Sequence, residues 1–155
     1  MELVCPAGNL PSLKAAVDNG ANAVYLGFRD DTNARHFAGL HFDEGRAMQG
    51  IQYAHTKGVR VFLTLNTYPQ PTGWARWQRA VDAAADLGVD ALIAADIGVM
   101  DYVASKWPNL ALHLSVQGSA TNYEAIRFYA EHFQIRRVVL PRVLSISQVR
   151  TVIEH

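Results

Sequence analysis

Gly20-Ala21-Asn22-Ala23-Val24-Tyr25-Leu26 is echoed later in the chain by Gly88-Val89-Asp90-Ala91-Leu92-Ile93-Ala94. Looser copies occur at residues 58–63 and 136–140. Each copy follows a stretch with helical spacing, turns on a small or polar residue, and enters a short apolar run that must be buried on both faces. This repetition predicts βα units arranged around a parallel sheet.

The composition is that of a neutral globular chain. Half of the 155 residues are hydrophobic, and 14 basic side chains balance 14 acidic ones. We therefore expect no polyanion-binding surface and no nucleic-acid partner. No apolar run approaches the roughly 20 residues of a membrane span, and the amino terminus has no leader pattern, so a cytoplasmic location is expected. Cys5 is the only cysteine and cannot form an internal disulfide.

Six βα units follow one another without a linker, which predicts a single domain over residues 1–155. Strands are predicted at residues 3–5, 23–26, 60–65, 91–94, 110–116 and 137–140. Asn9, Asp43 and Asp96 stand where helix caps are favoured, although Asp96 is also a candidate base. Thr121-x-x-Glu124 and Ser145-x-x-Gln148 have capping-box spacing and are expected to begin the last two helices. Trp74 and Trp77 fall on one helical face and are expected to pack in the core.

Two architectures fit six such units, a doubly wound open sheet and a closed barrel. A nucleotide-binding open sheet usually carries a glycine-rich phosphate loop after its first strand, and residues 5–9 do not form one. A full barrel needs eight units and roughly 250 residues. The prediction is therefore an α/β fold, with six βα units of a TIM-type (β/α) barrel that is incomplete in this chain. Because the chain stops inside an apparent helix, we expect it to be the amino-terminal portion of a longer protein.

Four blocks of the sequence carry a family resemblance. They are residues 1–10, residues 30–40 (Asp-Asp-Thr-Asn-Ala-Arg-His-Phe-Ala-Gly-Leu), residues 75–82 and residues 138–142. The chain resembles the collagenase-like peptidase family (U32) over essentially its whole length. Within that family it is most similar to the UbiU-like branch, which takes part in ubiquinone biosynthesis. The block at residues 30–40 is long and unusual enough to make the resemblance specific.

The resemblance implies more than a peptidase. UbiU-like proteins act with a homologous, UbiV-like partner in oxygen-independent hydroxylation of a ring. Each member of the pair binds a [4Fe-4S] cluster through four cysteines. In the family these cysteines lie beyond the last residue of this chain, and Cys5 is not one of them, so no metal ligand is assigned here. The implied substrate is a small anionic or aromatic molecule.

Side chains that follow the strands of a barrel point into a common mouth, and this position selects the candidate site residues. Arg35 and His36 follow the second strand, where an arginine can pair with a carboxylate and a histidine can move a proton. Asn66 ends the third strand, and its amide can bind a carbonyl or hydroxyl group. Arg35 can equally tie down its loop, and Asn66 can equally form a turn.

The fifth strand alternates in polarity. His113, Ser115 and Gln117 share one face, opposite Leu112, Leu114 and Val116. Ser115 and Gln117 are predicted to line the pocket, and His113 to be a hydrogen-bonded core histidine. Arg142, directly after the sixth strand, is predicted to bind an anion, with a structural salt bridge as the alternative.

Three hypotheses remain open for the function. The first is a redox-cofactor protein, in which the pocket binds the substrate and a cluster outside this segment supplies electrons. The second is a peptidase in which Cys5, activated by His36 or His113, is the nucleophile, although packing of Cys5 in the core is favoured. The third is a non-catalytic scaffold that self-associates through its open barrel edges.

Overall fold

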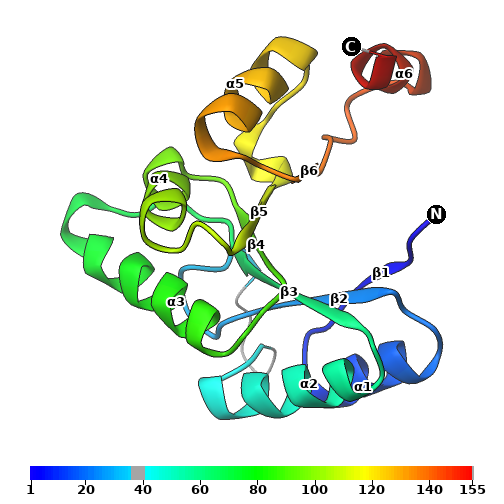
Figure 1. Ribbon diagram of the computed structural model, residues 1–155, viewed down its shortest axis with the longest axis vertical. Helices are drawn as coiled ribbons and strands as arrows, with labels where there is room; N and C mark the ends of the chain where they lie inside the picture. Colours follow the sequence, from blue (N-terminus) through cyan, green and yellow to red (C-terminus); the bar gives the residue numbers. More distant parts are fainter. Residues whose placement is uncertain (36–40, 155) are drawn as a thin grey trace.

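The computed structural model describes residues 1–35 and 41–154 (Figure 1). Six strands form one parallel sheet in chain order. They are β1 (Val4–Pro6), β2 (Ala23–Gly27), β3 (Arg60–Leu65), β4 (Ala91–Ala94), β5 (Ala111–Leu114) and β6 (Arg137–Val138). The helices are α1 (Leu10–Asp18), α2 (Glu44–Thr56), α3 (Trp74–Asp86), α4 (Ile97–Lys106), α5 (Tyr123–Phe133) and α6 (Ile146–Glu154). The predicted six βα units of a TIM-type barrel are confirmed as a half-barrel.

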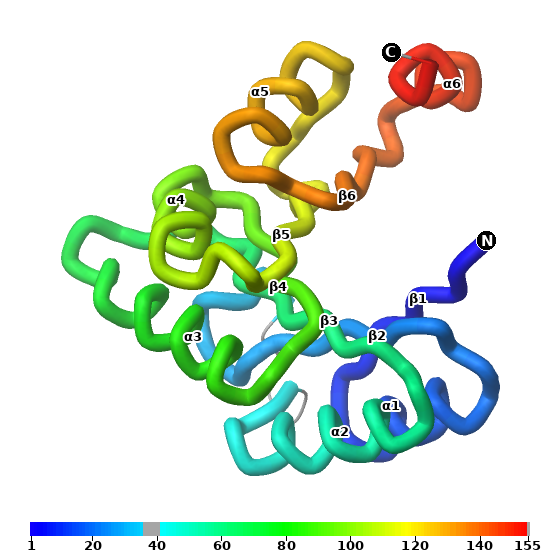
Figure 2. The backbone as a smooth tube through the Cα atoms, viewed as in Figure 1, coloured from blue at the N-terminus to red at the C-terminus, as the bar shows by residue number. Residues whose placement is uncertain are grey.

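The helices α1 to α5 follow one another around the outside of the curved sheet (Figure 1). The tube view shows the amino terminus and α6 on the same side of the molecule, where the sheet is open (Figure 2). The open side is bounded by β1 and β6, because each of these strands has a hydrogen-bonded neighbour on one edge only in the described sheet. The half-barrel thus has a covered outer surface and an accessible inner one.

Helix starts in this chain are set by local side chains. Asn9, Asp43 and Asp96 each accept a hydrogen bond from a backbone N–H in the first turn of α1, α2 and α4. Capping satisfies donors that the first helical turn leaves unpaired. The capping role predicted for Asp96 is confirmed, since its carboxylate lies 3.0 Å from the amide nitrogen of Val99.

Several predicted boundaries need correction. β1 is shifted by one residue from the predicted 3–5, β2 extends one residue further, and β6 ends at Val138 and not at residue 140. The cap of α5 is Asn122, which accepts from the Ala125 amide, and not Thr121. The fifth strand ends at Leu114, because residues 116–118 form a 3-10 turn, η2 (Val116–Gly118), behind it. The Ser145–Gln148 capping box is confirmed by two reciprocal hydrogen bonds of 2.7 and 3.3 Å.

The sheet buries apolar side chains on both faces. Between the strands and the helices lies the main core, which includes Leu63, Leu92, Leu114 and the buried Trp77 of α3. A second, smaller cluster lies on the inner face and is formed by Ala23, Phe62, Ala91 and Ile93. Because both faces of the strands are buried, their sequences are continuous apolar runs. None of the described helices is long and apolar enough to cross a bilayer.

Apolar side chains are exposed beside the open side of the half-barrel. Leu3 precedes β1, and Val139, Val143, Ile146 and Ile153 follow β6, with exposed fractions from 42% to 83%. Apolar surface of this kind favours association.

We expect the 155-residue chain to self-associate through this surface. Sedimentation velocity should show species larger than a monomer, and replacing Val143, Ile146 and Ile153 together by Ser should shift them to the monomer. Met48→Ser, an equally polar change on the outer face of α2, is the control and should leave the distribution unchanged. A wild-type chain that stays monomeric at every concentration would contradict the expectation.

Candidate functional site

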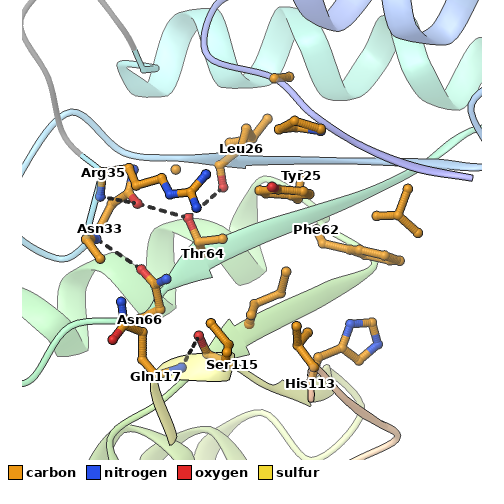
Figure 3. Close-up of a pocket in the computed structure, with 18 of the residues that line it drawn as sticks. Tyr25, Leu26, Asn33, Arg35, Phe62, Thr64, Asn66, His113, Ser115 and Gln117 are labelled. Carbon is orange, nitrogen blue, oxygen red and sulfur yellow. Dashed lines mark hydrogen bonds between the residues drawn. The ribbon is translucent and has the colours of Figure 1, made fainter. Parts of the chain in front are cut away.

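A cavity of about 580 Å³ lies inside the half-barrel. Its wall includes Val4, Tyr25, Phe62 and Ile93, whose side chains leave a mostly apolar surface. At the carboxyl ends of the strands the wall becomes polar, with Asn66, Ser115 and Gln117 among its members (Figure 3). The carboxyl ends of barrel strands are where barrel enzymes carry their active sites.

The polar face of β5 is turned into this cavity. His113 and Ser115 line it, whereas Leu112 and Leu114 pack in the main core on the helix side, as predicted. The prediction that Val116 lies opposite Ser115 and Gln117 is wrong, because the alternation ends where η2 begins and Val116 also lines the cavity. Inside that turn, the Ser115 hydroxyl accepts a hydrogen bond of 3.2 Å from the Gln117 amide.

Gln117 is held at the mouth by a neighbouring loop. Tyr68 donates a hydrogen bond of 2.6 Å from its hydroxyl to the Gln117 carbonyl oxygen. The backbone of Gln117 is thus tied to the β3–α3 loop, and its side-chain amide lines the cavity. Burial raises the pKa of Tyr68, so this hydroxyl stays protonated near neutral pH.

His113 is a neutral imidazole in the wall. It is 7% exposed, and its ring meets Phe62 edge to face, with centroids 4.7 Å apart. Burial, with the nearby positive charges of Arg137 and Arg60, lowers the pKa of His113 to about 4. The prediction of a hydrogen-bonded core histidine is wrong, since no hydrogen bond to this ring is found within residues 1–35 and 41–154.

A charged cluster lies at the amino-terminal end of the half-barrel. Glu2 forms ion pairs with both Arg60 of β3 and Arg137 of β6. Hydrogen bonds from Arg137 and Arg60 lower the pKa of Glu2. The two guanidinium carbons lie 5.7 and 5.5 Å from the centroid of the Phe62 ring, within the range of cation–π contact. Glu2 thereby connects the first strand with the third and the sixth.

The loop after β2 is packed onto β3 through Asn33. The Asn33 side-chain oxygen accepts from the Arg35 amide at 3.2 Å and lies 3.4 Å from the Thr64 hydroxyl. Its amide nitrogen lies 3.3 Å from a ring nitrogen of His41, whose other ring nitrogen contacts the Arg35 carbonyl oxygen. Asn33 is 4% exposed. Gly27 makes room for it, because a Cβ at residue 27 would lie 2.2 Å from the Asn33 amide nitrogen.

Two of the predicted site residues, Asn66 and Arg35, lie at this loop. Asn66 accepts a hydrogen bond of 3.0 Å from the Ala34 amide, so its oxygen holds the loop while its amide nitrogen remains at the cavity wall (Figure 3). Arg35 is exposed at the mouth and lines the cavity, and no ion pair to its side chain is found among the described residues. Asn66 thus anchors the loop after β2, and its role in binding a ligand stays a prediction.

Two predicted residues, Arg142 and Cys5, are not brought to the cavity, and a third lies outside the described residues. Arg142 is exposed in the turn after β6 and is not part of the cavity wall. Arg137, the second residue of the repeat copy at residues 136–140, lines the wall from β6 instead. His36 lies outside the described residues. Cys5 packs against the main core on the helix side of β1, so the prediction that it can reach His113 is wrong.

The described residues do not form a metal site. No group of three or more His, Cys, Asp or Glu side chains gathers anywhere in the described ranges. A [4Fe-4S] cluster needs four thiolates, and this chain supplies one cysteine, on the wrong face of the sheet. These residues therefore do not fit a cluster.

Several cavity residues were missed by sequence reasoning. They are Tyr25, Asn33, His41, Phe62, Thr64 and Arg137. The alternation of β3 contained a signal, because Phe62, Thr64 and Asn66 are two residues apart and share a face. The arginine inside the short β6 strand was a second signal, since a charged side chain in a buried strand needs a partner.

The chain matches known proteins over nearly its whole length. The family model described as peptidase family U32 matches residues 8–155. A tRNA hydroxylation protein P of Haemophilus influenzae is 31% identical over 96% of this chain and 32% of its own length. A collagenase of Porphyromonas gingivalis is 34% identical over 99% of this chain and 36% of its own. The chain thus spans about a third of these relatives.

A solved structure supports the fold. A U32 peptidase superposes with a TM-score of 0.77 and 16% sequence identity, covering 99% of this chain and 64% of that one. At this identity the similarity concerns the half-barrel fold alone.

Gly27→Ala is expected to destabilise the protein by about 1 to 3 kcal/mol, because the new methyl group collides with Asn33 and with the Thr64 hydroxyl, 2.6 Å away. Urea unfolding measures the loss. Gly45→Ala is the matched control, since its nearest contact would be an ordinary 3.5 Å. Equal stability of the two variants would contradict the packing described for Asn33.

His113 is expected to make stability depend on pH. The pKa of His113 in the folded protein, about 4, lies below the ordinary histidine pKa of 6.5, so the unfolded chain binds more protons between these two pH values. The free energy of unfolding contains the full contribution of neutral His113 above about pH 6.5. It decreases as the pH falls toward 4, by roughly 3 kcal/mol at most. Thermal unfolding of the wild type and His113→Phe tests this. The two slopes should differ between pH 6.5 and 4, and parallel curves would refute the assignment.

Proposed function

This chain belongs to peptidase family U32, and from that membership we propose that it is the ring-binding part of a protein that supports oxygen-independent hydroxylation. The observation that carries the proposal is the cavity itself, whose apolar and aromatic wall is bordered by amide and hydroxyl groups. Such a combination suits a planar ring that bears a few polar substituents.

Different side chains of the cavity would bind different parts of the ring. Tyr25 and Phe62 provide aromatic surface against which a ring can lie and from which water is displaced. The amides of Asn66 and Gln117 can orient polar substituents at the carboxyl ends of the strands. Arg35 adds a positive charge at the mouth, where it attracts an anionic group.

We further propose that the ring belongs to a ubiquinone precursor. The support is the block at residues 30–40, which resembles the UbiU-like branch and whose Asn33 and Arg35 belong to the cavity. In this proposal the chain is the amino-terminal part of a longer protein that acts with a UbiV-like subunit. A [4Fe-4S] cluster held by cysteines outside this segment would supply electrons.

The relative from Haemophilus influenzae is named for tRNA, which makes an RNA base the other candidate ring. The balance of 14 basic and 14 acidic side chains argues for a small ring, since binding to a polyanion normally depends on an excess of basic residues.

A peptidase is the alternative that the collagenase relative suggests. The described residues offer it little support. Cys5 packs on the helix side of the sheet, away from the cavity that contains His113. Ser115 lies in the cavity, but its hydroxyl is engaged by the Gln117 amide, and no hydrogen bond to His113 is found in the described part of the chain. A hydrolytic serine or cysteine needs a base within hydrogen-bond reach.

The test uses the full natural reading frame, expressed without oxygen together with a homologous partner. Iron and sulfide should be present at about four of each per chain. Anaerobic cells that carry Gln117→Ala in place of the wild type should make about tenfold less ubiquinone, the effect of losing one orienting hydrogen bond, with iron content unchanged.

Gln52→Ala removes the same amide from the exposed face of α2 and is the matched control, with wild-type yield expected. Iron-free, stable protein would overturn the cluster proposal. Peptide cleavage that disappears in Cys5→Ala would favour the peptidase instead. Hydroxylated RNA together with a normal ubiquinone yield in Gln117→Ala cells would favour an RNA base as the substrate.

A further inference from the structure

His113 presents an imidazole to the cavity that no hydrogen bond from the described part of the chain engages. His113 is 7% exposed and lines the cavity, and neither of its ring nitrogens has a hydrogen-bond partner in the described part of the chain. Its ring nitrogens are reachable from the cavity, since the buried side-chain atom without a partner among the described residues is Trp77 Nε1 and not an atom of His113. An unpaired imidazole in an apolar wall is therefore a place where a ligand can gain affinity.

The surroundings of His113 determine what kind of group it can meet. In the parallel register it lies between Ile93 of β4 and Arg137 of β6. Ile93 is apolar, and the Phe62 ring contacts the imidazole in a T-shaped arrangement. Arg137 is already paired with Glu2 and stacked over Phe62. Beside Ile93, Phe62 and Arg137, His113 is therefore the polar side chain that can hydrogen-bond to a ligand.

The protonation state of His113 further limits which ligand groups can bind to it. Burial and the positive charges of Arg137 and Arg60 hold its pKa well below neutrality, so at pH 7 the ring has one N–H donor and one bare nitrogen acceptor. The bare nitrogen can accept a hydrogen bond from a hydroxyl group, whereas an ionised carboxylate has no proton to donate to it. The neighbouring Tyr25 hydroxyl is less constrained, because Tyr25 is only half-buried and water can reach it.

We propose that His113 is the residue that selects the bound ring, by accepting a hydrogen bond from a hydroxyl group attached to that ring. In this proposal the ring lies against Phe62 and Ile93, and its hydroxyl is directed at the imidazole. Figure 3 shows Phe62 and His113 in the cavity wall. This assignment rests on the proposed function, which supplies the ring. It adds that the ring must carry a hydroxyl group and that His113 is the side chain that binds this group.

The test measures binding and involves no turnover. The full-length protein, purified without oxygen, is titrated with two probes of nearly equal size, p-cresol and 4-fluorotoluene, by ligand-observed NMR. Only p-cresol can donate a hydrogen bond. The wild type should bind p-cresol about fivefold more tightly, the factor expected for one neutral hydrogen bond. In His113→Phe the preference should vanish, because the more apolar probe then binds at least as well.

Two further variants keep the result interpretable. His113→Gln retains an acceptor and should restore part of the preference, and it replaces the Phe variant if that one does not fold. His132→Phe makes the same change on exposed α5 and should keep the wild-type ratio. Equal affinities for the two probes in the wild type, or a preference that survives in His113→Phe, would overturn the assignment. Loss of hydroxylation with the probe preference intact would instead count against the proposed function alone.

Discussion

The parallel pairing of six strands in chain order is the constraint on which the other features depend. Because neighbouring strands run in the same direction, every connection must cross back over the outside, where the helices bury the outer face of the sheet. All carboxyl ends then meet at one edge. Side chains as distant in sequence as Asn33 and Gln117 thereby share one cavity, and no single segment of the chain could have built it.

The mouth of that cavity depends on close packing between a loop and a strand. Gly27 leaves the space that the Asn33 amide occupies, and Asn33 in turn contacts Thr64 and the backbone of Arg35. Asn66 holds the same loop at Ala34. A guanidinium on a long loop would ordinarily sample many positions, at an entropic cost to any ligand it binds. Anchoring the loop backbone at Ala34 and Arg35 reduces that cost.

The opposite end of the half-barrel is organised by charge. One carboxylate, Glu2, is shared by two guanidinium groups, so the Glu2–Arg60–Arg137 cluster retains a net positive charge beside the inner face. That charge and burial together keep His113 neutral. The cavity therefore combines a positive amino-terminal end, a neutral imidazole in an apolar wall, and an amide-rich mouth, which gives a bound ring distinct surroundings along its length.

The elements of this fold could be predicted from the sequence alone. The bounds of β3 and β4 and the caps at Asn9, Asp43 and Asp96 agree with the structure, because strand periodicity and capping act within a few residues. The inward direction of His113 and Ser115 followed from alternation, which failed at Val116 where η2 begins. Only the tertiary structure decided that Arg137, and not Arg142, reaches the cavity and that Cys5 does not. Those outcomes depend on register and sheet curvature between distant strands, which no local pattern encodes.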